Sequence, residues 1–195
     1  MTSTTPIALA LAALLSAGVA TLSGQERRSN AFRFENTPEN LQAFMTLIYR
    51  KLHVEKSVEE AGELFTSLVP NRARLKRALR DEVPAEVSDR IVTFFAPFAK
   101  ATPADVMKIA AADQSVVRVR GATTEQIIEA REGTVAYEEF PGGAREIAPK
   151  ILRLGTTFYQ VEFRPPGKEQ GITYHLFYWD GERWAMLGPA WRALR

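Results

Sequence analysis

The stretch Tyr174-His-Leu-Phe-Tyr-Trp-Asp-Gly-Glu-Arg-Trp-Ala-Met-Leu187 decides how this chain folds. Two apolar, aromatic-rich runs flank Asp180-Gly181, and an Asp-Gly pair between such runs is typical of a β-hairpin turn. A two-residue turn places Trp179 opposite Glu182, whereas a four-residue loop places Trp179 opposite Trp184. The segment is a hairpin in either case, and a two-residue turn predicts which side chains share each of its faces.

Both faces of this hairpin are apolar, although a sheet covered on one side only alternates apolar with polar residues. One face carries His175, Phe177, Trp179, Trp184 and Met186. The other carries Tyr174, Leu176, Tyr178, Ala185 and Leu187. The second face therefore lines a pocket inside a curved sheet, is covered by Trp191 and Leu194 of the tail, or meets a protein partner or a second copy. The residues expected to bind an apolar small molecule, a lipid or a protein partner are Tyr174, His175, Phe177, Trp179, Trp184 and Met186.

The chain upstream of the hairpin, from Gln114 onward, also favours strands, because segments rich in β-branched and aromatic residues lie between turn residues. A short helix is expected over 123–131, and Pro141-Gly142-Gly143 is expected to turn the chain. Consecutive strands joined by short turns predict an antiparallel meander. The predicted strands are 115–120, 134–140, 147–154, 156–164, 172–179 and 182–187.

Residues 37–113 show the apolar spacing of helices and predict five of them. Thr37-Pro38-Glu39 is a typical helix start, with a capping hydroxyl, a proline at the first helical position and an acid in the first turn. Helices that precede such a sheet predict an α+β fold, with N-terminal helices packed on a C-terminal curved antiparallel β-meander. We expect one domain over residues 36–195, with a helical part at 37–113 and a sheet part at 115–190.

The hairpin 174–187 resembles the last two strands of nuclear transport factor 2-like proteins, in which a D-G-x-W turn commonly joins the final strands beneath a set of helices. The match covers about 14 residues and the order of helices before sheet, although five helices exceed the two or three usual in that family. The resemblance implies a cone-shaped α+β domain and carries over no catalytic residue. The helices, late sheet and apolar leader also resemble periplasmic phospholipid-carrier proteins, which hold acyl chains between two layers.

The N-terminus carries an apolar leader, because residues 6–24 contain no charged side chain. An apolar run followed by small residues, with Gly18 and Ala20 suited to a cleavage site, is typical of a secretory signal. Two features count against a secretory signal: no Lys or Arg precedes the run, and Arg27 and Arg28 follow it, which favours a cytoplasmic flank. The rival is an uncleaved membrane anchor, although so short an Ala-rich run barely spans a bilayer. A buried N-terminal helix is the third interpretation. We expect residues 1–24 to be a signal peptide or anchor, 25–35 a tether, and the protein to be exported to the periplasm or secreted.

The composition excludes several classes of site. The chain has no cysteine and two histidines, so a disulfide scaffold, a cysteine nucleophile and zinc thiolate centres are ruled out. Its 25 Lys+Arg against 23 Asp+Glu give little reason to expect a nucleic-acid partner. No metal-ligand spacing, phosphate-binding glycine loop or nucleophile elbow is present. We therefore expect no metal and no cofactor.

The sequence offers one candidate for proton-transfer chemistry. His175 pairs with Glu162 if the hairpin between their strands places them opposite each other, and a carboxylate beside an imidazole makes a general base. Tyr159, Tyr174 or Tyr178 would then orient substrate or donate a proton. A single histidine on an aromatic strand is more often a hydrogen-bonded structural residue. His53, near the end of the first predicted helix, suits the helix dipole there.

A basic stretch offers a second candidate surface, at Arg72, Arg74, Lys76, Arg77 and Arg80. It either contacts anionic lipid headgroups or forms a solvated face balanced by Asp81, Glu82 and Glu86. Membrane contact is expected only through this stretch or the leader. Because groups suited to catalysis are few, we expect an exported non-catalytic α+β domain that binds an apolar small ligand or a protein partner through its aromatic sheet. The alternative is a small cone-fold enzyme that uses Glu162 and His175.

Overall fold

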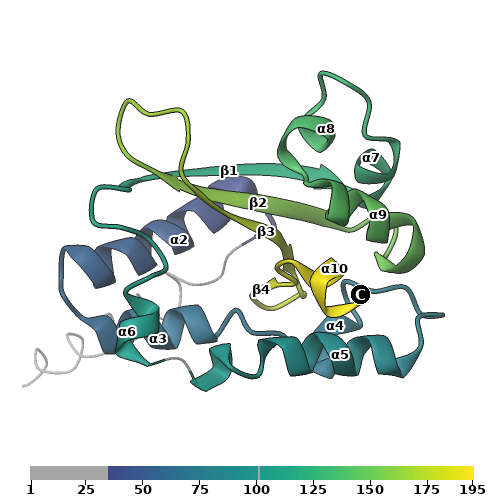
Figure 1. The fold of residues 1–195 in the computed structure, drawn as a ribbon, viewed down its shortest axis with the longest axis horizontal. Helices are drawn as coiled ribbons and strands as arrows, with labels where there is room; N and C mark the ends of the chain where they lie inside the picture. Colours follow the sequence, from purple (N-terminus) through teal and green to yellow (C-terminus); the bar gives the residue numbers. More distant parts are fainter. Residues whose placement is uncertain (1–34, 101) are drawn as a thin grey trace, which may run out of the picture. The chain divides into compact units, whose positions relative to one another are not determined.

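The computed structural model describes residues 35–100 and 102–195, and this part of the chain has the α+β fold expected from the sequence (Figure 1). The leader expected over residues 1–24, and all but the last residue of the tether expected over 25–35, lie outside the described residues. The described residues belong to one compact unit. No described helix is long and apolar enough to cross a membrane.

The N-terminal half of the described chain is helical, as predicted. Thr37 caps the first helix, and its side chain accepts a hydrogen bond from the backbone N–H of Asn40. The basic stretch that begins at Arg72 forms a helix of only four residues, and the chain then pairs Leu79 with Leu152 in an isolated bridge. The helices are α2 (Pro38–His53), α3 (Val58–Thr66), α4 (Arg72–Leu75), α5 (Ala85–Phe95), the 3-10 turn η1 (Phe98–Lys100) and α6 (Pro103–Val106).

The C-terminal half contains a four-stranded sheet in the order β1-β2-β3-β4, with every neighbouring pair antiparallel. Strands two to four follow one another along the chain, but a helical segment of about 30 residues separates the first two. The prediction of an antiparallel sheet is therefore confirmed, whereas a short turn between its first two strands is not. The strands are β1 (Val116–Thr123), β2 (Thr157–Arg164), β3 (Ile172–Trp179) and β4 (Trp184–Met186).

Two predicted strands, 134–140 and 147–154, are wrong, because the chain between β1 and β2 forms helices. Thr134 caps α8 by accepting a hydrogen bond from Tyr137 N–H. The residues expected to turn the chain, Pro141-Gly142-Gly143, instead open α9. Its buried residues recur at intervals of three and four, which is a helical period. The three helices are α7 (Thr124–Glu129), α8 (Val135–Glu139) and α9 (Gly142–Ile151).

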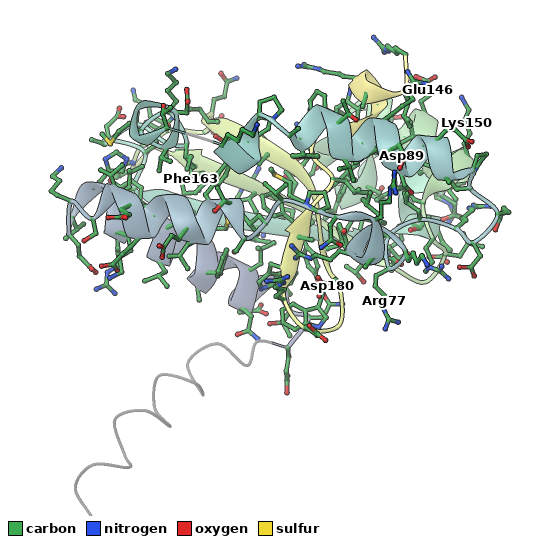
Figure 2. All side chains as sticks on the ribbon, turned by 90° about the horizontal axis from the view of Figure 1, so that it is seen from below. Arg77, Asp89, Glu146, Lys150, Phe163 and Asp180 are labelled. Atoms are coloured by element: carbon green, nitrogen blue, oxygen red, sulfur yellow. The ribbon has the colours of Figure 1, made fainter. Side chains whose placement is uncertain are left out.

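The sheet lies between two layers of helices. One face packs on α2, whose Gln42 donates a hydrogen bond to the Val117 carbonyl in β1, and α3, α5 and α6 lie on this side (Figure 1). The other face is covered by α7, α8 and α9, while the C-terminal α10 (Ala190–Ala193) contacts both α9 and α5. Phe163 of β2 is fully buried between these layers, whereas Arg77 and Lys150 project from the surface (Figure 2).

A β-bulge in β3 changes which side chains share a face. Val161 pairs with Tyr174, and Tyr159 pairs with Phe177, so two residues of β3 oppose one of β2. Leu176 within the bulge has φ 56°, in the left-handed region. Tyr174 and Phe177 therefore face α2 together. The prediction that His175 and Phe177 share a face is wrong.

The hairpin between β3 and β4 has the four-residue loop, and the two-residue turn is wrong. Trp179 pairs with Trp184, and Asp180 N–H donates to the Arg183 carbonyl across the loop at 3.1 Å. The Asp180 carboxylate accepts hydrogen bonds from the N–H groups of Glu182 and Arg183, both at 2.9 Å. These hydrogen bonds stabilise the four-residue loop, because they give the backbone N–H groups of Glu182 and Arg183 an acceptor within the loop.

Candidate functional site

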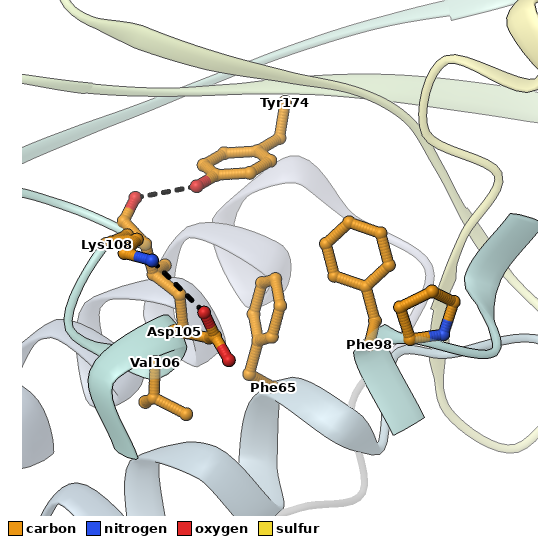
Figure 3. Close-up of a pocket in the computed structure, with 8 residues that line it drawn as sticks. Phe65, Phe98, Asp105, Val106, Lys108 and Tyr174 are labelled. Carbon is orange, nitrogen blue, oxygen red and sulfur yellow. Dashed lines mark hydrogen bonds and ion pairs between the residues drawn. The ribbon is translucent and has the colours of Figure 1, made fainter. Parts of the chain in front are cut away.

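A cavity of about 330 Å³ opens between the helical layer and the edge of the sheet (Figure 3). Helix α3 contributes one wall, the segment from the end of α5 to η1 a second, the α6 region a third, and β3 the roof. Its walls are formed by side chains that are mostly apolar or aromatic. The lining residues are Phe65, Pro97, Phe98, Asp105, Val106, Lys108, Ile109 and Tyr174.

Tyr174 holds the roof of the cavity in place. Its ring packs edge-on against Phe65, with centroids 6.3 Å apart, and against Phe163 at 6.2 Å. Its hydroxyl donates to the Ile109 carbonyl at 2.8 Å, and burial raises the pKa of Tyr174 to about 12. The hydroxyl is therefore occupied and remains protonated at physiological pH. Tyr174 therefore forms a fixed roof over the cavity and does not act there as an acid or a base.

The polar groups of the cavity lie at its rim. Lys108 Nζ lies 3.2 Å from Asp105 Oδ1, while Asp105 Oδ2 accepts hydrogen bonds from Thr102 N–H (3.1 Å) and Thr102 Oγ1–H (2.7 Å). The Thr102 hydroxyl, the Thr102 N–H and Lys108 together lower the pKa of Asp105 to about 2. Phe98 is 39% exposed at the opening. The cavity is thus an apolar pocket with a charged rim.

The structure separates the residues predicted to form one binding face. Only Tyr174 lines the cavity. Phe177, Trp184 and Met186 are buried core residues, and Trp179 packs on Trp184 with ring centroids 5.2 Å apart. The missed wall residues, Phe65, Phe98, Val106 and Ile109, all have the apolar spacing of predicted helices, but nothing in their sequence places them around one hollow.

A polar cluster lies on the opposite face of the sheet. Arg118 donates to Glu162 at 2.9 Å and to Glu139 of α8 at 3.0 Å. Gln160 donates to the same Glu139 at 2.9 Å, and its amide oxygen lies 3.0 Å from His175 Nδ1. Arg118, Gln160 and Glu139 were not predicted as site residues, the last because α8 was predicted as a strand.

The pairing expected between Glu162 and His175 is not formed. Glu162 lies opposite Thr173, and its ion-pair partner is Arg118. The bulge in β3 shifts the histidine toward Gln160. Among the described residues, no hydrogen bond or ion pair joins Glu162 to His175.

His175 is covered by the C-terminal helix. The Trp191 ring of α10 lies 5.9 Å from the imidazole, and a Cβ on Gly143 of α9 would lie 2.4 Å from the same indole. The tail therefore covers this face, as one of the sequence-based alternatives proposed. Burial, followed by the charge of Arg192, lowers the pKa of His175. The imidazole is neutral at neutral pH.

We expect His175→Gln to reduce the pH dependence of stability. Because the pKa of His175 is lowered in the folded state, the unfolded chain binds the proton more readily, and stability decreases as pH falls below about 6.5, the unperturbed value. Thermal unfolding midpoints measured from pH 8 to pH 5 test this. The variant should match the wild type at pH 8 and show a smaller decrease at pH 5. An unchanged decrease would contradict the assignment.

The basic stretch does not form one surface. Arg74 is buried and forms an ion pair with Asp180, whereas Arg72 pairs with Asp89 on α5. Arg80 donates to the Leu152 carbonyl at 2.9 Å. The other histidine, His53, lies at the end of α2 with Nε2 2.9 Å from the Ala110 carbonyl, so it joins α2 to the segment after α6.

The fold and the cavity together define an α+β domain with an apolar pocket between a helical layer and an antiparallel sheet. Among the described residues, no group of three or more His, Asp or Glu side chains is placed to hold a metal ion. No family model, curated protein or solved structure matches the chain. The resemblance to nuclear transport factor 2-like proteins therefore rests on the hairpin and the order of elements alone.

Proposed function

We propose that this protein is a non-catalytic binding domain for an apolar small molecule, held in the cavity beneath Tyr174. The observation that supports this proposal is the cavity itself, with aromatic side chains on three sides. Burial of a ligand among Phe65, Phe98 and Tyr174 would remove apolar surface of both partners from water, which is the main driving force in such pockets.

The size of the cavity limits its ligand. Small-molecule pockets span about 300–1,000 Å³, so a cavity of about 330 Å³ lies at the small end. A single alkyl chain or a compact ring system suits this volume better than a lipid with two acyl chains. The proposal therefore narrows the expected lipid class to single-chain molecules.

The alternative, a small enzyme that uses Glu162 and His175 for proton transfer, has weaker support. Glu162 is neutralised by Arg118, and the Nδ1 atom of His175 is held by Gln160. The Trp191 ring also packs against the imidazole. A hydrogen-bonded, ion-paired cluster of this kind suits a structural role, whereas a catalytic base needs access to its substrate.

We also propose that the protein is exported. The support is the uncharged leader of residues 6–24 and the absence of cysteine. The mass of the mature protein, purified from cells that express the full sequence, tests this proposal. Removal of about 20 residues supports export with cleavage, whereas a full-length chain in the membrane fraction supports the anchor.

We expect Phe98→Ala to weaken binding of N-phenyl-1-naphthylamine, a neutral fluorescent apolar probe. The substitution removes one wall of the cavity, and the loss of this aromatic contact should raise the Kd roughly 5- to 10-fold. Leu154→Ala is the matched control, because Leu154 is a similarly exposed apolar residue, at 53%, away from the cavity. A wild-type protein that does not bind the probe, or equal Kd values for wild type and Phe98→Ala, would overturn the proposal.

A further inference from the structure

We infer that the ligand of the cavity is a single-chain carboxylate whose head group binds Lys108. The inference rests on the function proposed above and adds the chemical class of the ligand. Lys108 is the only cation among the eight residues that line the cavity, and its side chain lies at the rim beside Asp105 (Figure 3). An apolar chain inside the cavity would place its polar end at this rim.

Asp105 has hydrogen-bond partners besides Lys108. Its Oδ2 accepts two hydrogen bonds from Thr102, and only Oδ1 contacts the lysine. The side chains of Lys108 and Asp105 are 75% and 53% exposed, and exposed pairs of this kind contribute little to stability. Lys108 can therefore turn from Asp105 toward a ligand at small cost, because the carboxylate keeps its Thr102 bonds and contact with water.

The unused hydrogen-bonding capacity of the rim favours an anion. A lysine ammonium has three donors, and among the described residues Lys108 donates one hydrogen bond, to Asp105. Asp105 already accepts three hydrogen bonds through its two oxygens, and the Tyr174 hydroxyl is bonded to the Ile109 carbonyl. Lys108 is thus the lining side chain whose remaining donors face solvent, and these suit an acceptor such as a carboxylate. A cationic ligand would compete with Lys108 for Asp105, whereas a carboxylate would bind Lys108 on its solvent side, with the ammonium between it and Asp105.

The same geometry fixes how such a ligand lies. Its chain would occupy the space between Phe65, Phe98 and Tyr174, and its carboxylate would remain at the rim, partly in water. Full burial of the head group would be costly, because a desolvated carboxylate needs more partners than one lysine supplies. The arrangement keeps the charge solvated while the chain is buried.

The test compares decanoate with methyl decanoate as competitors that displace N-phenyl-1-naphthylamine from the protein. The two have the same chain and differ in charge. For Lys108→Gln, we expect the Kd for decanoate to rise about 3- to 5-fold while that for the ester stays within error, because an exposed charged contact is lost. Lys108→Glu should raise the decanoate Kd further, and 0.5 M salt should reduce the difference between wild type and variant.

Lys150→Gln is the matched control. Lys150 pairs with Glu146 one helical turn away at 3.4 Å, and the two side chains are 65% and 58% exposed on α9, away from the cavity (Figure 2). It should leave both Kd values unchanged. If Lys108→Gln leaves decanoate binding unchanged while Phe98→Ala weakens both competitors, the carboxylate inference fails and the proposed function stands. If neither competitor displaces the bound probe, the carboxylate inference fails, while the proposed function is decided by probe binding to the wild type and to Phe98→Ala.

Discussion

Replacing Arg74 by Met should reduce the free energy of unfolding by about 3–5 kcal/mol, the cost of breaking a buried ion pair from one side. The Arg74 and Asp180 side chains are 8% and 7% exposed. Beyond its bond to Asp180, the guanidinium donates to the carbonyls of Ser67, Val69 and Trp184. The substitution leaves one carboxylate and three carbonyls without this donor, and it removes the link between α4 and the β3–β4 hairpin.

Urea denaturation of the variant, compared with the wild type, measures this loss. Arg77→Met is the matched control, since Arg77 is three residues along the chain and its side chain projects from the surface (Figure 2). It should change stability by less than about 0.5 kcal/mol, as surface substitutions usually do. If the two variants lose the same amount, the Arg74 contacts do not stabilise the fold.

The same ion pair makes the protein sensitive to acid. Burial opposes ionisation of Asp180, but hydrogen bonds from the N–H groups of Arg183 and Glu182, together with Arg74, lower its pKa below 3.8. The unfolded chain therefore binds this proton more readily. The contribution of Asp180 is present above about pH 4 and is lost as pH falls through the lowered value. This loss of stability at low pH is expected of a carboxylate that stabilises the loop only while it is ionised.

The parts of the fold that could be predicted are those fixed by local chemistry. The Asp180-Gly181 pair located the last hairpin, and Thr37-Pro38-Glu39 located the start of α2. The helices α8 and α9 were predicted as strands, because over such short segments a few β-branched or apolar residues fit a period of two as well as a helical period. The capping hydroxyl of Thr134 was the available signal for α8.

The candidate site could be predicted only in part, for a different reason. Tyr174 was predicted to contact a ligand and lines the cavity, but the cavity exists because segments more than 100 residues apart, from Phe65 to Tyr174, meet in the fold. The bulge at Leu176 has no local signature, since its positive φ is taken by a residue that rarely adopts it. A shift of one residue then moves His175 to the other face of the sheet.

Replacing Arg118 by Met should reduce the free energy of unfolding by about 2–3 kcal/mol, somewhat less than for a fully buried pair because Arg118 is 28% exposed. Glu162 and Glu139 are only 8% and 14% exposed, and both bind this guanidinium. Without it, two carboxylates converge on one site and repel each other. The hydrogen bond from Gln160 to Glu139 cannot compensate for a missing charge.

Neutralising the two acids separates charge from packing. The triple variant Arg118→Met, Glu139→Gln, Glu162→Gln should recover most of the loss, because the amides repel each other far less than the carboxylates do. Arg120→Met is the control, since Arg120 lies two residues along β1 on the same face and is exposed. If the triple variant is no more stable than Arg118→Met in urea denaturation, the arginine acts through its packing and not through its charge. Recovery of stability would show that Arg118 stabilises the fold by offsetting the repulsion between Glu139 and Glu162. The polar cluster beside His175 would then have a structural role.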